Sequence, residues 1–208
     1  MVAYVAKDFS HLFGTPGFSD ALLSQHFDLY QAYVKNASEL SQLIDDARRS
    51  GRASEASAGG LRRRFAWEWN GMRLHELYFG NLTAKKTSSK GAPTLVEELT
   101  KSFGSFEAWS KDFRAVGGLR GVGWAALVRD PVLERMHNLW IDEHNVGHLA
   151  GGHPLLLMDV FEHAFLTDYG TKRADYIEAF FGAIDWKAVE GRFAQSVSSA
   201  LQEAAARP

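Results

Sequence analysis

Two long runs of apolar residues with a helical period constrain the fold of this chain most strongly. In residues 18–47 apolar side chains recur every three or four positions, and residues 61–82 repeat the pattern. The segment between them is rich in glycine and serine, which interrupt helices and favour a turn. Two amphipathic helices joined by a polar turn pack against each other, so we predict an N-terminal antiparallel helical hairpin.

The second half of the chain changes from helical to strand-like patterns. A first short helix is predicted at 94–103, with Thr94 as its capping residue and Glu97 three positions later. A helix at 105–116, strands at 124–128, 134–142 and 154–160, and helices at 171–184 and 186–202 follow. The fold class is therefore α+β. A polar linker rich in Lys, Ser and Gly at 83–93 predicts a boundary between a helical-hairpin domain at 1–88 and a C-terminal α/β domain at 93–208.

Composition and charge exclude several classes of protein. The 208 residues carry 23 Lys and Arg against 25 Asp and Glu, a balance that argues against a nucleic-acid partner. No apolar stretch approaches the roughly 20 residues of a membrane helix, and the first residues lack a secretory pattern, so a cytoplasmic location is expected. Cysteine is absent. A bound transition metal must therefore rest on His and carboxylate groups, which suit iron, manganese and zinc.

His26 and His75 form the first candidate site. Their midpoint in the sequence falls on Ser50 and Gly51, at the start of the predicted turn. Residues equidistant from the turn of an antiparallel hairpin lie at the same level. Both also lie on the apolar stripes and should face each other, either as two core histidines or as metal ligands.

Asp159 and His163 form the second candidate site. Asp159 ends a strand-like run, and His163 follows four residues later, within one helical turn. This spacing alone is a weak signal. Combined with the hairpin histidines, it offers three imidazoles and one carboxylate, a set that suits a divalent or trivalent iron or manganese ion.

Several segments resemble the iron/manganese superoxide dismutases. They are HELYFGNL at 75–82, GVGW at 121–124, DVFEHAF at 159–165 and the pattern DYxxxRxDY at 168–176. The resemblance implies a helical hairpin followed by a three-stranded antiparallel sheet flanked by helices, with superoxide as the substrate. It further implies one iron or manganese ion per subunit, held by His26, His75, Asp159 and His163, so that the C-terminal domain completes the metal site.

The resemblance also assigns roles around the metal. It implies that Tyr33 lies at the substrate gateway, Trp124 lines the site and Arg173 lies near the substrate funnel. Glu162 would cross the interface of a homodimer to the other subunit's His163. The family's donor to metal-bound solvent can be a Gln four residues before the second ligand, but Gly71 stands there, so we expect His144 to be the donor.

The sequence also departs from the family pattern. Tyr30, Leu166 and Phe161 replace a His, a Tyr and a Trp that the family usually has around the site. In the family the gateway Tyr usually follows the first ligand by eight residues. An ungapped match from Tyr33 would therefore place Gln25 at the ligand position. We choose His26, because seven residues along a helix return to nearly the same face and Gln is a poor ligand for this ion.

Three functions fit these residues. The leading one is superoxide dismutation. The changes at Tyr30, Leu166 and Phe161 leave open a metal-binding paralogue without dismutase activity, a stress-associated binding or structural protein. A non-haem iron oxygenase with two His and one carboxylate is disfavoured by the third imidazole at His26. Iron against manganese, and a dimer against a tetramer, stay open.

Overall fold

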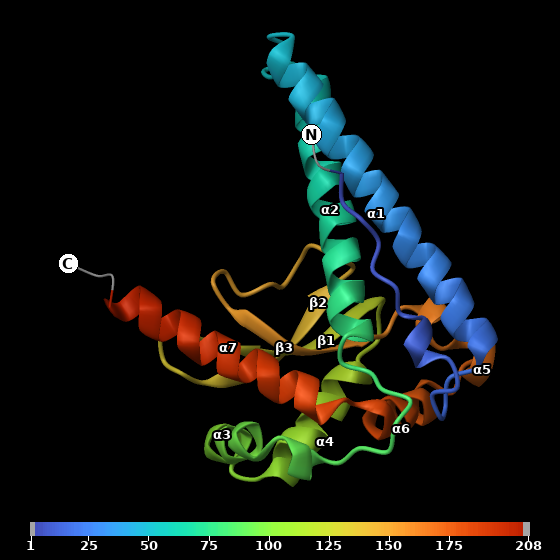
Figure 1. Ribbon diagram of the computed structural model, residues 1–208, viewed down its shortest axis with the longest axis vertical. Helices are drawn as coiled ribbons and strands as arrows, with labels where there is room; N and C mark the ends of the chain where they lie inside the picture. The colour runs from blue at the N-terminus through green and yellow to red at the C-terminus, as the bar shows by residue number, and fades with distance from the viewer. Residues whose placement is uncertain (1–2, 206–208) are drawn as a thin grey trace.

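A long helical hairpin standing on a sheet-containing body defines the architecture (Figure 1). The computed structural model describes residues 3–205 of the chain. The hairpin consists of α1 (Asp20–Arg49) and α2 (Ala56–Phe79), and its closed end projects away from the sheet. The fold is α+β, as the sequence predicts. No helix within the described residues is long and apolar enough to cross a membrane.

The hairpin helices begin and end for local reasons. The side chain of Ser19 accepts a hydrogen bond from the backbone N–H of Leu22 and so caps the start of α1. The helix ends at Arg49, and Ser50 is its C-cap residue beside the turn. α2 begins at Ala56, five residues before the predicted start. Its early glycines are tolerated because they fall on the exposed side of the first turns, while Ala58 is buried against the hairpin.

The helices that follow the hairpin are α3 (Pro93–Phe103) and α4 (Phe106–Gly117). The capping role predicted for Thr94 is wrong. α3 starts at Pro93, and the backbone N–H groups of Thr94 and Leu95 donate to the carboxylate of Glu190 at 3.1 and 2.9 Å. A side chain distant in sequence therefore satisfies the helix start. The separation of the chain into two domains at this linker stays a prediction.

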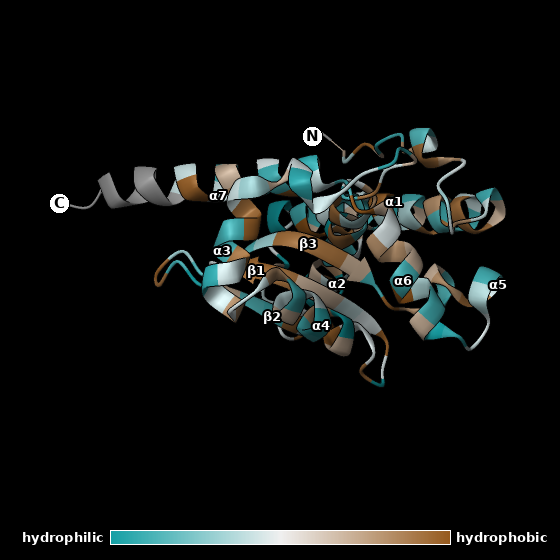
Figure 2. Ribbon diagram, turned by 90° about the horizontal axis from the view of Figure 1, so that it is seen from below, coloured by the Kyte–Doolittle hydropathy of each residue, from teal (hydrophilic) through white to brown (hydrophobic). Residues whose placement is uncertain are grey.

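The sheet has three antiparallel strands in the order β2-β1-β3. The strands are β1 (Gly123–Arg129), β2 (Met136–Asp142) and β3 (His153–Asp159). All residues of the central strand β1 are buried, and Figure 2 shows the hydrophobic residues gathered along β1 and β3. The register pairs Trp124 with Asp159, so both lie at the same end of the sheet.

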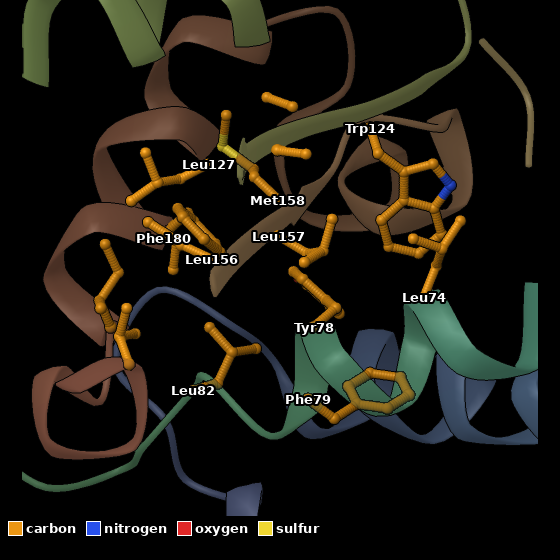
Figure 3. Close-up of a cluster of buried hydrophobic side chains, with 14 of the residues drawn as sticks. Leu74, Tyr78, Phe79, Leu82, Trp124, Leu127, Leu156, Leu157, Met158 and Phe180 are labelled. Atoms are coloured by element: carbon orange, nitrogen blue, oxygen red, sulfur yellow. The ribbon is translucent and has the colours of Figure 1, made fainter. Parts of the chain in front are cut away.

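The core lies where α2 meets the sheet. In Figure 3, Leu74 and Tyr78 of α2 face side chains of β1 and β3, whereas the ring of Phe79 packs on Phe27 of α1 at 5.0 Å. Beyond β3 the chain passes through a 3-10 turn (Glu162–Ala164) and α5 (Leu166–Tyr169), and ends with two longer helices. These are α6 (Arg173–Ala183) and α7 (Trp186–Ala205). The C-terminal helices complete the fold, and α2 packs on β3, the strand that ends at Asp159.

The open edge of β3 is closed by side chains. Asn81, fully buried just after α2, donates its amide N–H to Leu157 O at 3.2 Å and accepts from Leu157 N at 3.0 Å. Arg192 of α7 donates to Leu155 O at 3.0 Å on the same strand. Backbone N–H and C=O groups at a buried strand edge are costly without hydrogen-bond partners. Asn81 and Arg192 supply bonds that a neighbouring strand would otherwise make.

We predict that Asn81→Ala destabilises the fold. The substitution leaves the N–H and C=O of Leu157 without the bonds that Asn81 makes, and each unpaired buried group costs about 1–3 kcal/mol. Chemical denaturation of the metal-free protein should show the free energy of unfolding lowered by about 2–4 kcal/mol. Asn145→Ala, at an exposed position, is the matched control, and equal stabilities of the two variants would contradict the role of Asn81.

Candidate metal centre

Four predicted ligands meet near the open end of the hairpin, opposite its turn, where the hairpin reaches the sheet. His26 comes from α1, His75 from α2, Asp159 from the end of β3 and His163 from the turn that follows. One ligand atom from each lies within 4.8 Å of all the others.

The carboxylate of Asp159 lies at the centre of this cluster. Its Oδ2 is 3.2 Å from His26 Nε2, 3.5 Å from His75 Nε2 and 3.1 Å from His163 Nε2. The second carboxylate oxygen accepts the backbone N–H of Phe161 at 2.9 Å, which fixes the orientation of the group. One oxygen of Asp159 is thereby directed at the three imidazoles.

His75 has the hydrogen-bonding state of a metal ligand. Its Nδ1–H donates to the backbone carbonyl of Gly71 at 2.6 Å, so the proton resides on Nδ1. Its Nε2 then carries a lone pair, yet it is fully buried and has no hydrogen-bond partner among the described residues. A buried nitrogen lone pair facing two imidazoles and a carboxylate fits a cation, and this donor set suits iron or manganese.

Burial keeps the ligands in the states that bind a metal. It lowers the pKa of His26 and lowers that of His75 further, so both imidazoles stay neutral. Burial alone would raise the pKa of Asp159, but the charge of His163 and the hydrogen bonds from His163 and His26 outweigh it and lower the pKa. Burial therefore keeps His26 and His75 neutral, and their partner Asp159 stays ionised.

The one-residue ambiguity in the first helix has a clear geometric outcome. His26 is buried within the cluster, whereas Gln25 is exposed and accepts a hydrogen bond from the hydroxyl of Thr167 at 3.2 Å. The side chain of Gln25 is thus engaged outside the ligand cluster. Tyr33, seven residues after His26, still reaches the site, and its ring lies 5.1 Å from that of His75.

Tyr33 and His144 form a hydrogen-bonded pair beside the ligands. Trp124 donates its indole N–H to His144 Nδ1 at 3.1 Å, so that nitrogen carries no proton. His144 Nε2–H consequently donates to the hydroxyl oxygen of Tyr33 at 2.8 Å. The Tyr33 hydroxyl hydrogen then remains free for another acceptor.

Gly71 makes room for Tyr33. A Cβ at position 71 would lie 2.7 Å from a Tyr33 ring carbon, which is too close. A glutamine at this position would therefore displace the tyrosine. A donor side chain at position 71 of α2 therefore does not fit this packing. The expectation that His144 donates to metal-bound solvent stays a prediction, since its N–H is donated to Tyr33.

The other predicted site residues have varied surroundings. Phe161 stacks on His144 and His163, with ring centroids 4.8 and 5.2 Å away. Tyr30 is buried, donates to Glu76 at 3.1 Å and accepts from the backbone N–H of Lys7 at 3.0 Å, so it ties the N-terminal segment to α2.

Arg173 and Glu162 lie together on the side of the site that faces outward. Arg173 donates to the carbonyls of Leu119, Gly121 and Val160, and so clamps the ends of β1 and β3. Glu162 is exposed, and within residues 3–205 its carboxylate has no hydrogen-bond or ion-pair partner. Both residues line one surface hollow.

Sequence reasoning missed Trp67. Its ring lies 4.6 Å from that of His144 and 5.6 Å from that of Tyr33. It lies one helical turn before Gly71 on α2. Trp67 falls outside the regular apolar spacing of residues 61–82, so helical periodicity gives no signal for it.

Comparisons with known proteins agree with this geometry. Residues 91–192 match the family model of the iron/manganese superoxide dismutase C-terminal domain. The manganese superoxide dismutase 2 of Haloferax volcanii is 36% identical over 184 residues, covering 88% of this chain and 90% of that protein. The iron superoxide dismutase of Methanothermobacter thermautotrophicus is 34% identical over 176 residues, covering 84% and 85%.

We predict that His26→Ala loses bound metal and that Gln25→Ala does not. Only His26 directs a nitrogen at the cluster, and a site lacking one ligand binds its metal poorly. Plasma mass spectrometry of both purified variants measures the difference. Full metal occupancy in His26→Ala, or loss in Gln25→Ala, would show that the helix uses the other register.

The metal-free protein should lose stability in acid, in part through His144. Burial lowers its pKa to about 4, whereas an unfolded His titrates near 6.5. Between about pH 6.5 and 4 only the unfolded state takes up this proton, so stability falls with falling pH, by about 1.4 kcal/mol per unit. Urea denaturation of His144→Gln should show a shallower fall in this window. An exposed control, His11→Gln, should match the parent, and an unchanged slope in His144→Gln would count against the effect.

Proposed function

The chain belongs to the iron/manganese superoxide dismutase family, and we propose that His26, His75, Asp159 and His163 hold its metal ion. It is an oxidoreductase that converts superoxide to oxygen and hydrogen peroxide, with one iron or manganese ion as cofactor. The observation that supports this ligand set most strongly is the buried, unpartnered Nε2 of His75 facing Asp159.

The bound ion supplies one-electron chemistry by alternating between its divalent and trivalent states. The protein contributes three imidazoles and one carboxylate in a largely buried site. Forming hydrogen peroxide consumes protons, and any change of buried charge without a proton is costly. The chain must therefore deliver protons to the buried metal site, and only a few polar side chains next to the ligands can do so.

Tyr33 is the group best placed for this task. Its side chain is 8% exposed and thus lies between the buried ligands and the surface. Burial, and next the charge of Asp159, raise the pKa of Tyr33 well above its ordinary value, so the hydroxyl keeps its proton at neutral pH. His144 occupies one lone pair of the hydroxyl oxygen, which leaves Tyr33 O–H to donate toward the substrate. Trp124 in turn fixes the His144 tautomer.

The surface around Glu162 supports a homodimer. Leu119, Val122 and Leu166 are 48, 41 and 50% exposed near the hollow that Glu162 and Arg173 line. His163 directs Nε2 at Asp159 and keeps 28% of its side chain exposed, so its Nδ1 is left for another partner. In a dimer, Glu162 would accept a hydrogen bond from the other subunit's His163, and two-fold symmetry would form this bond twice. A tetramer, the absence of nucleic-acid and membrane partners, and a cytoplasmic location stay predictions.

Metal exchange tests the function. Protein emptied with a chelator and reloaded with iron or manganese should regain superoxide disproportionation in proportion to bound metal for at least one of the two. Protein reloaded with zinc should stay inactive, because zinc has no redox chemistry at this site. Full loading with iron and with manganese that restores no activity in either case would contradict the assignment.

Glu162→Ala should largely dissociate the dimer, and Glu162→Gln should weaken it. Each substitution removes charge-assisted bonds that the symmetric interface would contain. Sedimentation velocity measures the association, and metal analysis shows whether the loss reaches the site. Glu107→Ala, an exposed glutamate on α4, is the control. A Glu162→Ala dimer with normal metal content would contradict this role.

A further inference from the structure

Trp67 of α2 stands over the Tyr33–His144 pair. Its indole ring meets the His144 ring edge-on at 4.6 Å and the Tyr33 ring at 5.6 Å. The side chain is half-buried, whereas His144 beneath it is fully buried. Trp67 therefore separates this hydrogen-bonded pair from the surface along the outer side of α2.

The indole N–H of Trp67 holds the turn that carries His144. It donates to Glu143 Oε2 at 3.0 Å, across 76 residues of sequence. Glu143 has a φ of 47°, a left-handed backbone conformation that residues with a Cβ adopt rarely. Its backbone N–H donates to Val122 O at 3.1 Å. His144 follows Glu143 directly in the chain. The backbone conformation of Glu143 therefore sets the direction in which the His144 side chain leaves the backbone.

Arg64 braces Trp67 from the same helix. Its guanidinium lies 4.3 Å from the centre of the indole ring, a cation–π contact. The same guanidinium is paired with Glu68, which is buried and also accepts a hydrogen bond from Asn36 of α1 at 3.2 Å. Trp67 is thus fixed by contacts to both hairpin helices and to the turn after β2.

We propose that Trp67 is a positioning residue of the Tyr33–His144 pair. The inference rests on the proposed function of that pair beside the metal. Trp124 holds Nδ1 of His144, and Phe161 stacks on the imidazole. Trp67 adds two further restraints, by covering the ring and by binding Glu143 in the turn that carries it. Both act without contact to the metal ligands in the described structure.

The two contributions can be separated by substitution. Trp67→Phe keeps an aromatic ring over His144 and removes the N–H, while Trp67→Ala removes both. Glu143→Ala removes only the acceptor and should reproduce Trp67→Phe. Trp69→Ala is the matched control, because Trp69 lies two residues along the same helix, is 37% exposed and lines a cavity on another side of α2.

The measurements are kcat/KM per bound metal ion, metal content, Tm and a crystal structure of each metal-loaded variant. We expect Trp67→Ala to keep its metal but to lose kcat/KM by about tenfold or more, as is usual for groups that orient a site. Trp67→Phe and Glu143→Ala should lose less. The crystal structure of Trp67→Ala should show the 2.8 Å contact between His144 Nε2 and Tyr33 Oη broken. Trp69→Ala should match the parent.

A purely structural role predicts a different pattern. A lowered Tm in Trp67→Ala with unchanged kcat/KM per metal and an intact His144–Tyr33 contact would overturn the inference. So would equal losses in Trp67→Ala and Trp69→Ala. If the parent binds iron and manganese yet fails to disproportionate superoxide, the proposed function fails. The His144–Tyr33 distance in the variants still decides the role of Trp67 in that case.

Discussion

Asp159 Oδ2 is the atom on which the rest of the structure depends. Three imidazole nitrogens, from α1, α2 and the turn after β3, lie 3.1 to 3.5 Å from it. A carboxylate buried in this way is stable only when it is paired with a positive charge, hydrogen-bonded or bound to a metal ion. The hairpin and the sheet therefore cannot separate without exposing these groups, and their closure creates the site that a cation fits.

The elements around Asp159 hold it from several directions. Its paired position opposite Trp124 places the indole that binds His144 Nδ1 at the same end of the sheet. Tyr176 of α6 donates to the Asp159 carbonyl at 2.5 Å. Asn81 fixes β3 two residues earlier by bonding both backbone groups of Leu157. Helix, strand and loop thereby position a single side chain, and the chemistry at Tyr33 follows from the same framework.

Sequence reasoning succeeded where the determinants are local or symmetric. The hairpin follows from helical periodicity, and the meeting of His26 with His75 follows from their equal distance to the turn. The placement of Asp159 at the end of a buried strand followed from the apolar run before it. These patterns need only neighbouring residues or one simple connection.

Interactions between distant segments were not predictable in the same way. Glu190 caps α3 from 95 residues away. Thr94 is a residue type that often caps helices, but its side chain does not cap α3. No role was assigned to Trp67 from the sequence, because its partners Tyr33, Glu143 and His144 belong to two segments distant from it in the chain. Nothing in the spacing of these residues indicates that they meet, since their contact depends on how the hairpin sits on the sheet.

Anomalous X-ray diffraction from crystals of the iron- or manganese-loaded protein tests the central claim most directly. The account predicts one metal peak per chain, bonded at about 2.0–2.3 Å to the Nε2 atoms of the three histidines and to Asp159 Oδ2. Gln25 should lie outside the coordination sphere. A peak elsewhere in the chain, or one coordinated by Gln25 in place of His26, would contradict it.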